Sequence, residues 1–359
     1  MIAGERPAFS TTDRTGDAMS GAFMSSVQDV SVGFSMERQK LKQIGSQSLS
    51  VNDINRMPDV ALSISYYYTP AMFNENMLGL VDSNPSYDGT GFFEDYTNED
   101  QNFYILNRDN QGSDFIEDDP SGDFFSSMLS GYEAGDDDIE LLSVGNAFLT
   151  NYSLSFEIGE LPVASTSYVA SNLSFEKLTG SAEITNPAIN LESGNTNGAG
   201  LVDLEKAKSK GFDYYSTLDR FRPPLCSPTD VNVTLQNLQI GGAPISGDAH
   251  LQSFSFNIPV GRVPLFGLGS NYPYGRKVQY PLTSPVSLEF LVSGFATGEI
   301  TSLISSESSY DFDIQVVDTE EEYQNTFSFE GLKLESSSYQ MSVNGQMSYS
   351  LNLSHEITN

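Results

Sequence analysis

The chain has 359 residues, and at about 150 residues per domain this length predicts two domains. It carries 17 Lys and Arg against 48 Asp and Glu, a net charge of −31, although only 18% of its residues are charged. Such a surface repels phosphates, which excludes nucleic-acid binding through a basic patch. With 38% hydrophobic residues, among them 23 Phe and 18 Tyr, the chain can bury a core, which excludes wholesale disorder.

The cysteine count and the apolar segments narrow the class further. A single cysteine, Cys226, excludes an intramolecular disulfide and a cysteine-rich metal site. Residues 1–12 lack the apolar region of a signal peptide, and no run approaches the roughly 18 apolar residues of a membrane span. We therefore expect an acidic, mostly β protein that is made in a reducing compartment and does not enter a membrane.

Strand patterns dominate the chain from end to end. Eight segments alternate apolar residues with small polar ones, the period of a strand with one buried face. In chain order they are residues 30–34, 60–64, 152–156, 231–235, 254–258, 286–290, 312–316 and 349–353. Helix is expected only in three short stretches, 69–80, 201–208 and 297–304. The predicted fold class is all-β with a minor helix.

An internal repeat relates the two halves of the chain. When Val27 is aligned with Leu251, 27–46 falls on 251–270, and the apolar positions of the first strand stay apolar in the second. Five positions are identical in the two copies: Ser31, Arg38, Leu41, Gly45 and Ser46 fall on Ser255, Arg262, Leu265, Gly269 and Ser270. Downstream, 103–109 resembles 312–318, and the stretch that ends in the Tyr152 strand resembles the one that ends in the Tyr349 strand. We interpret this pattern as a tandem duplication of one β domain.

The repeat and the changes in composition suggest domain boundaries. We expect an N-terminal arm (1–26), a first β domain (27–160), connecting strands with a linker (161–249) and a second β domain (250–359). The first domain contains an insert, 82–140, with 17 acidic residues and one basic residue, Arg108, or about half of the net negative charge. We interpret this insert as an elaborated surface loop.

No pattern in the chain indicates catalysis or a cofactor. The two histidines, His250 and His355, border predicted strands and have no nucleophile motif beside them. The acidic triplets 117–119 and 136–138 could offer ligands to Ca²⁺, but they lack the spacing that wraps a loop around an ion. A solvated acidic loop is the favoured interpretation, and no metal site is predicted.

Two pairs of residues repeat at equivalent positions and are candidates for structural roles. Arg38 and Arg262 are well placed for ion pairs within a domain or across a subunit boundary, or for hydrogen bonds to local carbonyl groups. Gly45 and Gly269 are expected to mark turns that need a positive φ or close packing. The sequence leaves these alternatives open.

The second copy resembles a known family. It contains the strand 254–258, then Arg262-x-Pro264-Leu-x-x-Leu-Gly-Ser270, then Tyr274-x-Arg276 and a proline before the strand 286–290. This succession resembles the tail tube (major tail) proteins of tailed bacteriophages. The first copy and residues 149–162 are similar but more diverged.

The resemblance implies a β-sandwich or barrel domain flanked by a helix, with the sheets of neighbouring subunits joined into rings. Stacked rings would form the tail tube of the virion, a structure assembled in the host cytoplasm. A duplicated chain would build a trimeric ring with pseudo-sixfold symmetry. Its partners would be further copies of itself and other tail proteins at the tube ends, and DNA would pass through an acidic lumen without specific binding.

On this interpretation, the polar positions of the strands face either the lumen or the exterior. These candidates are Ser153, Ser155, Ser255, Asn257, Ser287, Glu289, Ser350 and Asn352. If Arg262 pairs across subunits, Arg262→Glu should weaken ring assembly more than folding. The alternatives are another β-rich virion component, such as a tail terminator, baseplate or head-decoration protein, and a calcium-dependent acidic adhesin module.

Overall fold

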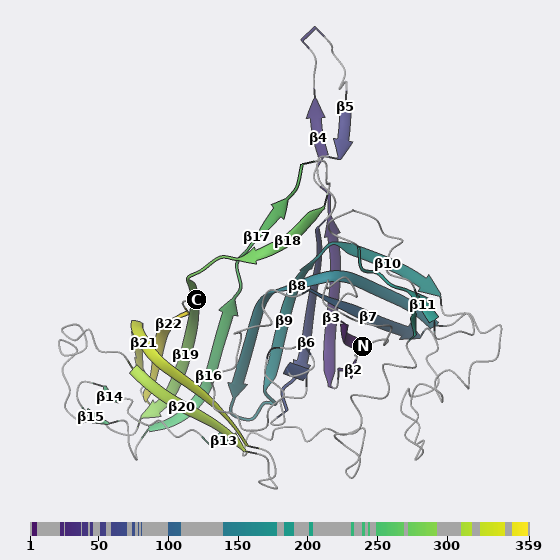
Figure 1. Cartoon of the computed structure of the whole chain (residues 1–359). Coiled ribbons are helices and arrows are strands. Elements are labelled where there is room, and N and C mark those ends of the chain that lie inside the picture. Colours follow the sequence, from purple (N-terminus) through teal and green to yellow (C-terminus); the bar gives the residue numbers. More distant parts are fainter. Residues whose placement is uncertain are drawn as a thin grey trace, which may run out of the picture.

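The computed structural model confirms an all-β fold built from antiparallel strands (Figure 1). It describes residues 2–5, 22–24, 26–36, 38–41, 44–45, 51–54, 59–69, 74–75, 78, 80, 100–108, 139–177, 183–189, 201–203, 231–232, 239–240, 243–244, 249–268, 272–292, 310–317, 324–341 and 347–357. Cys226, Gly269, both acidic triplets and most of the insert 82–140 lie outside these residues.

The first half of the chain contributes the strands up to β11. Their bounds are β1 (Ile2–Glu5), β2 (Ala22–Phe23), β3 (Val27–Ser35), β4 (Arg38–Leu41), β5 (Val51–Ile54), β6 (Asp59–Tyr67), β7 (Gln101–Arg108), β8 (Ile139–Glu157), β9 (Val163–Ala170), β10 (Asn172–Lys177) and β11 (Glu183–Thr185).

The second half contributes the remaining strands. Their bounds are β12 (Leu201–Asp203), β13 (Val231–Asn232), β14 (Gln239–Ile240), β15 (Ala243–Pro244), β16 (Ala249–Pro259), β17 (Arg262–Phe266), β18 (Pro273–Val278), β19 (Leu282–Val292), β20 (Tyr310–Val317), β21 (Gln324–Met341) and β22 (Met347–Ile357). Every predicted strand is confirmed over its described residues.

The helix predictions fare less well. The helix predicted at 201–208 is wrong over its described residues, because Leu201–Asp203 form β12 and pair antiparallel with β11. A tertiary partner strand here overrides a weak local helix signal. Within 69–80, Asn74 and Glu75 are helical, and the Leu78 amide donates to the Asn74 carbonyl at 2.8 Å. The stretch 297–304 lies outside the described residues.

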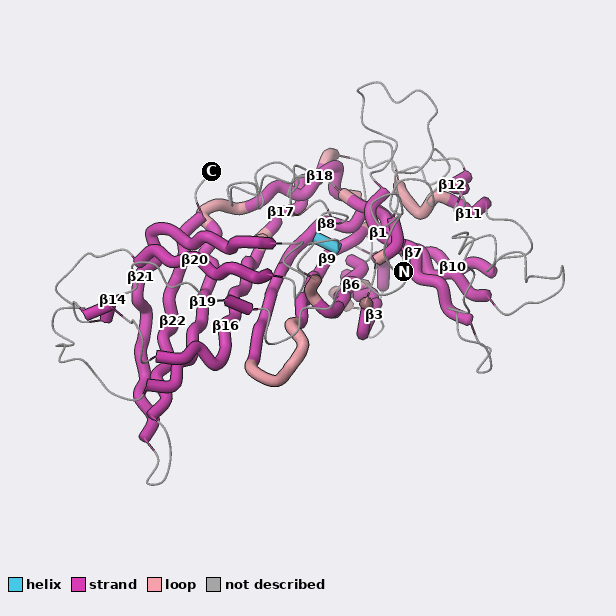
Figure 2. The backbone as a smooth tube through the Cα atoms, turned by 90° about the horizontal axis from the view of Figure 1, so that it is seen from below, coloured by secondary structure: helices cyan, strands magenta, loops and turns pink. Residues whose placement is uncertain are grey.

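One continuous sheet runs through both halves. Its central strands pair in the order β3, β6, β9, β8, β16, β19, β22 and β21, so that β8 of the first half lies beside β16 of the second (Figure 2). The two short hairpins β4–β5 and β17–β18 project from the same rim of this sheet (Figure 1). The sheet thus joins the halves edge to edge rather than face to face.

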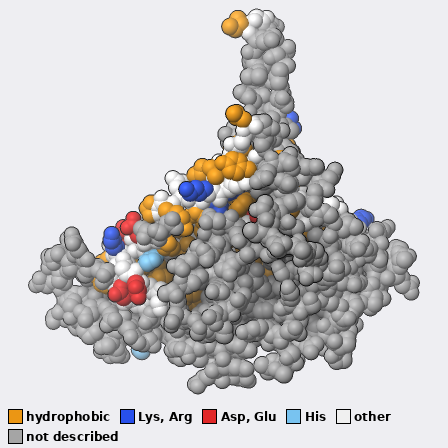
Figure 3. Space-filling model, viewed as in Figure 1, with side chains coloured by type: hydrophobic (Ala, Val, Ile, Leu, Met, Phe, Trp, Pro, Cys, Tyr) orange, Lys and Arg blue, Asp and Glu red, His pale blue; other side chains and the backbone are white. Residues whose placement is uncertain are grey.

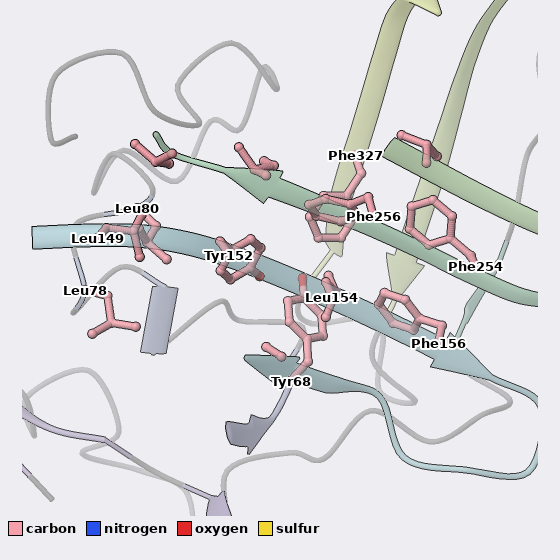
Figure 4. Close-up of a cluster of buried hydrophobic side chains, with 14 of the residues drawn as sticks. Tyr68, Leu78, Leu80, Leu149, Tyr152, Leu154, Phe156, Phe254, Phe256 and Phe327 are labelled. Carbon is pink, nitrogen blue, oxygen red and sulfur yellow. The ribbon is translucent and has the colours of Figure 1, made fainter. Parts of the chain in front are cut away.

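Two long strands, β8 and β21, link the central sheet to a second layer. The first part of β8 pairs with β7 and the rest with β9 and β16, while β21 pairs first with β20 and then with β22. In the second half, the ring centroid of Phe329 in β21 lies 5.8 Å from that of Phe254 and 5.5 Å from that of Phe256 in β16. The apolar strand faces therefore meet in a core of closely packed aromatic rings, which draws on both halves (Figure 4).

The strands of the two halves pair in the same order. The succession β3, β6, β9, β8, β7 corresponds to β16, β19, β22, β21, β20, and the hairpin β4–β5 corresponds to β17–β18. The register matches as well: Val30 faces Ile64 in the first half, and their equivalents in the repeat, Phe254 and Leu288, face each other in the second.

Irregularities of the strands fall at equivalent positions too. The register shifts in β3 between Val27 and Asp29, and in β16 between Leu251 and Ser253. It also shifts in β8 after Leu149 and in β21 after Leu334, and in β7 and β20 after Gln101 and Tyr310. A bulge is a local, specific feature of a strand pair. Three register shifts at equivalent positions therefore indicate that the two halves have the same strand architecture.

A backbone conformation with positive φ also recurs. Asn146 in β8 has a φ of 53°, and Gly331, at the equivalent place in β21, has a φ of 70°. The Asn146 amide donates to the side-chain oxygen of Asn102 at 3.0 Å, and the Gly331 amide donates to that of Asp311 at 2.7 Å. Asn and Gly are the residues that tolerate this left-handed region best.

The structure corrects one part of the sequence alignment. Tyr152 lies in β8, whose topological equivalent is β21, whereas Tyr349 lies in β22, the equivalent of β9. Residues 103–109 and 312–318, by contrast, fall on the equivalent strands β7 and β20. The predicted boundary at residue 160 falls in the turn between β8 and β9, which pair with each other, so the sheet of the first half extends beyond it.

A network of buried asparagines holds residues 186–189 against the first half of the sheet. Asn146 Nδ2 donates to Asp100 at 2.6 Å, and its Oδ1 accepts from the Ile189 amide at 2.6 Å. Asn186 Oδ1 accepts from Asn102 at 3.3 Å. The neighbouring Gly145 allows this approach, because a Cβ there would lie 2.1 Å from the Pro187 carbonyl oxygen.

We expect Gly145→Ala to destabilise the protein by about 3 kcal/mol, because the clash is with backbone that the asparagine network holds in place. Urea unfolding measures the loss. Gly261→Ala is the matched control, since a Cβ there meets nothing within 4 Å. Equal stability of the two variants would contradict the close approach at Gly145.

Candidate functional site

The described residues contain no group of His, Cys, Asp and Glu that could hold a metal ion, and no helix among them is long and apolar enough to cross a membrane. His250 is exposed at the start of β16, and His355 is half-buried on β22. They lie on different strands of the sheet, with His250 opposite Leu291 and His355 opposite Ser284. The Ser284 hydroxyl donates to the Asn257 carbonyl at 2.8 Å. The features that call for a functional explanation are the seam between the halves, the open sheet edges and one polar face.

The seam between the halves is the antiparallel pair β8–β16. Phe156 faces Phe254 and Leu154 faces Phe256 across it. Two further hydrogen bonds extend the seam at its ends, from the Val260 amide to the Thr150 carbonyl at 2.8 Å and from the Ile158 amide to the Gln252 carbonyl at 3.0 Å. The seam is an edge-to-edge strand pairing with a buried apolar face.

Arg262 bridges this seam. Its Nε donates to the Leu149 carbonyl at 2.6 Å, and one terminal nitrogen donates to the Arg276 carbonyl at 3.1 Å. Its guanidinium lies 5.4 Å from the ring centroid of Phe148. Burial, with the nearby charge of Arg276, lowers the pKa of Arg262 to about 10, so the side chain stays charged at neutral pH. Of the alternatives predicted for Arg262, the structure shows carbonyl contacts that join the two halves of one chain.

A second arginine, Arg276, crosses between the halves in the same place. It is buried on β18, and its guanidinium forms an ion pair with Asp59 at the start of β6, with a distance of 2.6 Å. Sequence reasoning singled out Arg276 only as part of a motif. The sequence offered one signal for the importance of Arg276, which is that only 17 of the 359 residues are Lys or Arg.

At the other end of the first half, β3 has an open edge. Among the described strands it pairs with β6 alone, although its equivalent, β16, pairs on both sides. Phe34 and Met36 are 59% and 45% exposed, whereas the equivalent Ile258 and Val260 are 7% and 1% exposed. Arg38, the equivalent of Arg262, is exposed. The apolar edge of β3 therefore lacks the cover that β16 receives from β8.

The complementary open edge lies on β21. Over residues 333–341 this strand pairs with β22, and no described strand pairs with its other side. The equivalent part of β8 pairs with β9 on one side and with β16 on the other. The two ends of the central sheet are thus β3 and β21, the equivalents of β16 and β8. β16 and β8 pair with each other at the centre of the sheet.

The predicted polar positions lie together on the sheet face opposite the apolar core. Ser155, Ser255, Ser287 and Asn352 are direct neighbours across β8, β16, β19 and β22. Ser287 donates to Asn352 at 2.7 Å, and Asn352 donates to Ser336 of β21 at 3.0 Å. The other candidates occupy the adjoining rows: Ser153 is opposite Asn257, and Glu289 is opposite Ser350. The face is continuous across both halves and rich in serine.

The projecting hairpins carry exposed apolar residues. Gly45 in the β4–β5 turn has a φ of 91°, which confirms its expected turn role. Beside it Ile44 is fully exposed, and so is the equivalent Leu268 beyond β17. Hydrophobic atoms also line the β17–β18 hairpin on the face that Figure 3 shows.

Sequence reasoning missed a buried carboxyl group, Glu75. Its Oε1 accepts hydrogen bonds from the hydroxyls of Tyr66 at 3.0 Å and Tyr152 at 3.2 Å. Burial raises the pKa of Glu75 to about 7, although the two tyrosine hydrogen bonds work in the opposite direction. Burial, and next the charge of Glu75, raise the pKa of Tyr66 well above its ordinary value, so this tyrosine remains a donor. These hydrogen bonds link the segment that follows β6 to both β6 and β8.

No family model matches the sequence, and no curated protein matches it either. The functional proposal therefore rests on the seam, the open sheet edges and the polar face.

Proposed function

We propose that the protein is the tail tube subunit of a tailed bacteriophage, a structural virion protein with a tandem duplicated β domain. In this proposal three chains close into a ring of six domains, and rings stack into the tube through which DNA passes. The observation that carries the proposal is the seam β8–β16, where two halves with the same order of strand pairing join edge to edge within one chain.

The duplication is supported by features that unrelated domains have no reason to share. Pairing order, register, three bulges and a residue with positive φ recur at equivalent positions in the two halves. The two open edges, on β3 and β21, are the same pair of edges that meet in the seam. Joining them between chains would pair edges that are otherwise exposed to uncontrolled association.

The serine-rich face is the one that suits the lumen. The second layer, with β7 and β20, lies on the apolar side of the central sheet, and a closed barrel has room for such a layer only outside. On this assignment the lumen would carry acidic side chains spaced among small uncharged ones. Asp29 lies in the row of Ser153 and Asn257, and Glu157 and Glu289 lie in a row with Ser253 and Ser350. Serine is the commonest residue between them. Small neutral groups offer DNA few cationic contacts, which favours passage without binding.

Electron microscopy of the purified full-length chain tests this function. We expect rings with apparent sixfold symmetry that stack into hollow tubes, and a mass per ring of three chains. Chains that remain monomeric at every concentration, or closed rings that never stack even with the parent particle's other tail proteins, would contradict the tube. A melting temperature that rises with added Ca²⁺ would instead favour the adhesin alternative.

A further inference from the structure

Resting on the proposed function, we infer that Arg38 locks the seam between chains. In this inference β3 of one chain pairs antiparallel with the end of β21 of a second copy, in the register that β16 and β8 already show. The guanidinium of Arg38 then donates to the Leu334 carbonyl of that copy.

The register follows from the equivalences between the halves. In the seam within the chain, Ser255 faces Ser155 and Asn257 faces Ser153. The shared register of the pairs β3–β6 and β16–β19 makes Ser31 and Gly33 of β3 the equivalents of Ser255 and Asn257.

The facing residues on β21 are assigned from their equivalents on β8 in the same way. Counted from the bulges after Leu149 and Leu334, the equivalents of Ser155 and Ser153 on β21 are Gln340 and Ser338. Ser31 should therefore face Gln340 of the neighbouring chain, and Gly33 should face Ser338.

The same equivalences assign the partner of Arg38. Arg38 and Arg262 begin equivalent hairpins, with Arg38 facing Ile54 and Arg262 facing Val278. Arg262 donates to the carbonyl of Leu149, which precedes the bulge in β8. Leu334 precedes the equivalent bulge in β21. Arg38 is exposed in the single chain because the strand that would accept its hydrogen bond belongs to another copy.

The neighbours of the two acceptor carbonyls differ. Phe148 and Thr150 flank Leu149, whereas Lys333 and Glu335 flank Leu334. The stacking of the guanidinium on Phe148 therefore has no counterpart between chains, because Lys333 takes the place of Phe148. The carboxylate of Glu335, which also accepts from Ser354 at 2.6 Å, lies beside these two cations. The seam between chains should accordingly depend more on salt concentration than the seam within the chain, which depends on apolar packing.

Disulfide trapping in the full-length protein tests the register. On a Cys226→Ser background, one variant carries Ser31→Cys with Gln340→Cys, and a second carries Val32→Cys with the adjacent opposite position, Tyr339→Cys. Wide and narrow residue pairs alternate along an antiparallel ladder, so one of the two variants places its thiols at the better spacing. The matched control combines Gln340→Cys with Ser35→Cys, which shifts one thiol by about 13 Å along the strand.

We expect oxidation to yield covalent dimers and trimers from at least one in-register variant, with trimer as the largest species, and none from the control. Equal cross-linking of the control, or no cross-linking of either in-register variant in preparations that form tubes, overturns the inference while leaving the tube function intact. In-register trimers without stacked tubes support the seam and count against the function instead.

The role of Arg38 is separated from folding by comparison with Arg262. Arg38→Ala should weaken ring assembly at least about tenfold, the value of a hydrogen bond from a charged group, with the melting temperature of the isolated chain unchanged. Arg262→Ala should lower that melting temperature, because its acceptors lie in the same chain. A melting temperature lowered equally by both, or assembly that survives Arg38→Ala, would overturn the assignment.

Discussion

Phe34→Asp is expected to abolish ring assembly and to leave the single chain as stable as the wild type. Phe34 is 59% exposed on the open edge of β3, so the substitution costs the folded monomer little, within about 0.5 kcal/mol. Its equivalent in the seam within the chain, Ile258, is 7% exposed. A carboxylate at that place in a closed seam would be buried without a partner, which costs several kcal/mol.

Analytical ultracentrifugation and thermal unfolding of the same samples measure the two effects. Phe175→Asp is the matched control, because Phe175 is 74% exposed on β10, which pairs with β8 and with neither β3 nor β21. The control should assemble as the wild type does. If both variants assemble normally, or if Phe34→Asp unfolds at a markedly lower temperature, then β3 is not the edge that a second chain covers.

The second large effect concerns the pH dependence of stability and the buried Glu75. Its pKa is raised from 4.5 to about 7 in the folded chain, chiefly by burial. Between these values the folded chain holds a proton that the unfolded chain has released, so the free energy of unfolding falls as pH rises from 4.5 to 7. At about 1.4 kcal/mol per pKa unit the loss is about 3 kcal/mol, and it is complete above pH 7.

Glu75→Gln should remove this loss, because a glutamine oxygen can still accept from Tyr66 and Tyr152. The variant is then more stable than the wild type at pH 8 and about equal to it at pH 4.5. Urea unfolding at both pH values gives the difference, in which all other titrating groups cancel. Glu157→Gln is the control, since Glu157 is exposed at the end of β8. A variant that is less stable than the wild type at pH 8 would show that Glu75 is stabilising when ionised.

The strands were predictable from the sequence because alternation of apolar and small polar residues is a local signal. The segment 254–258 shows the pattern directly, and the structure buries Phe254, Phe256 and Ile258 on one side of β16. The repeat could be located at its start for a similar reason, since strand, arginine and turn follow one another in both copies without an insertion.

The alignment failed further along the chain because the connections differ in length between the halves. Residues 68–100 lie between β6 and β7, where the shorter segment 293–309 lies between β19 and β20. Similar alternating patterns around Tyr152 and Tyr349 then matched strands that occupy different places in the sheet. Pairing order, which alternation does not encode, was needed to correct this.

The same distinction between local patterns and strand pairing applies to the candidate functional residues. Arg38 and Arg262 could be chosen from the sequence because they repeat, but their roles depend on which edge each hairpin stands beside. Only the β8–β16 pairing shows that Arg262 finds its acceptor within the chain. Glu75 could not be chosen at all, because its burial results from the packing of β6 and β8 against a segment that is distant from β8 in sequence.

The seam between β8 and β16 also bears on how the proposed ring would form. If each half of the chain is one domain of the ring, three of the six joins would be made as the chain folds, at the high effective concentration of tethered partners. Closure would then need three molecules to meet instead of six, so the amount of ring at equilibrium scales with the third power of free chain concentration and not the sixth. Ring formation would persist at dilutions where six separate subunits fall apart, and an odd number of domains could never be incorporated.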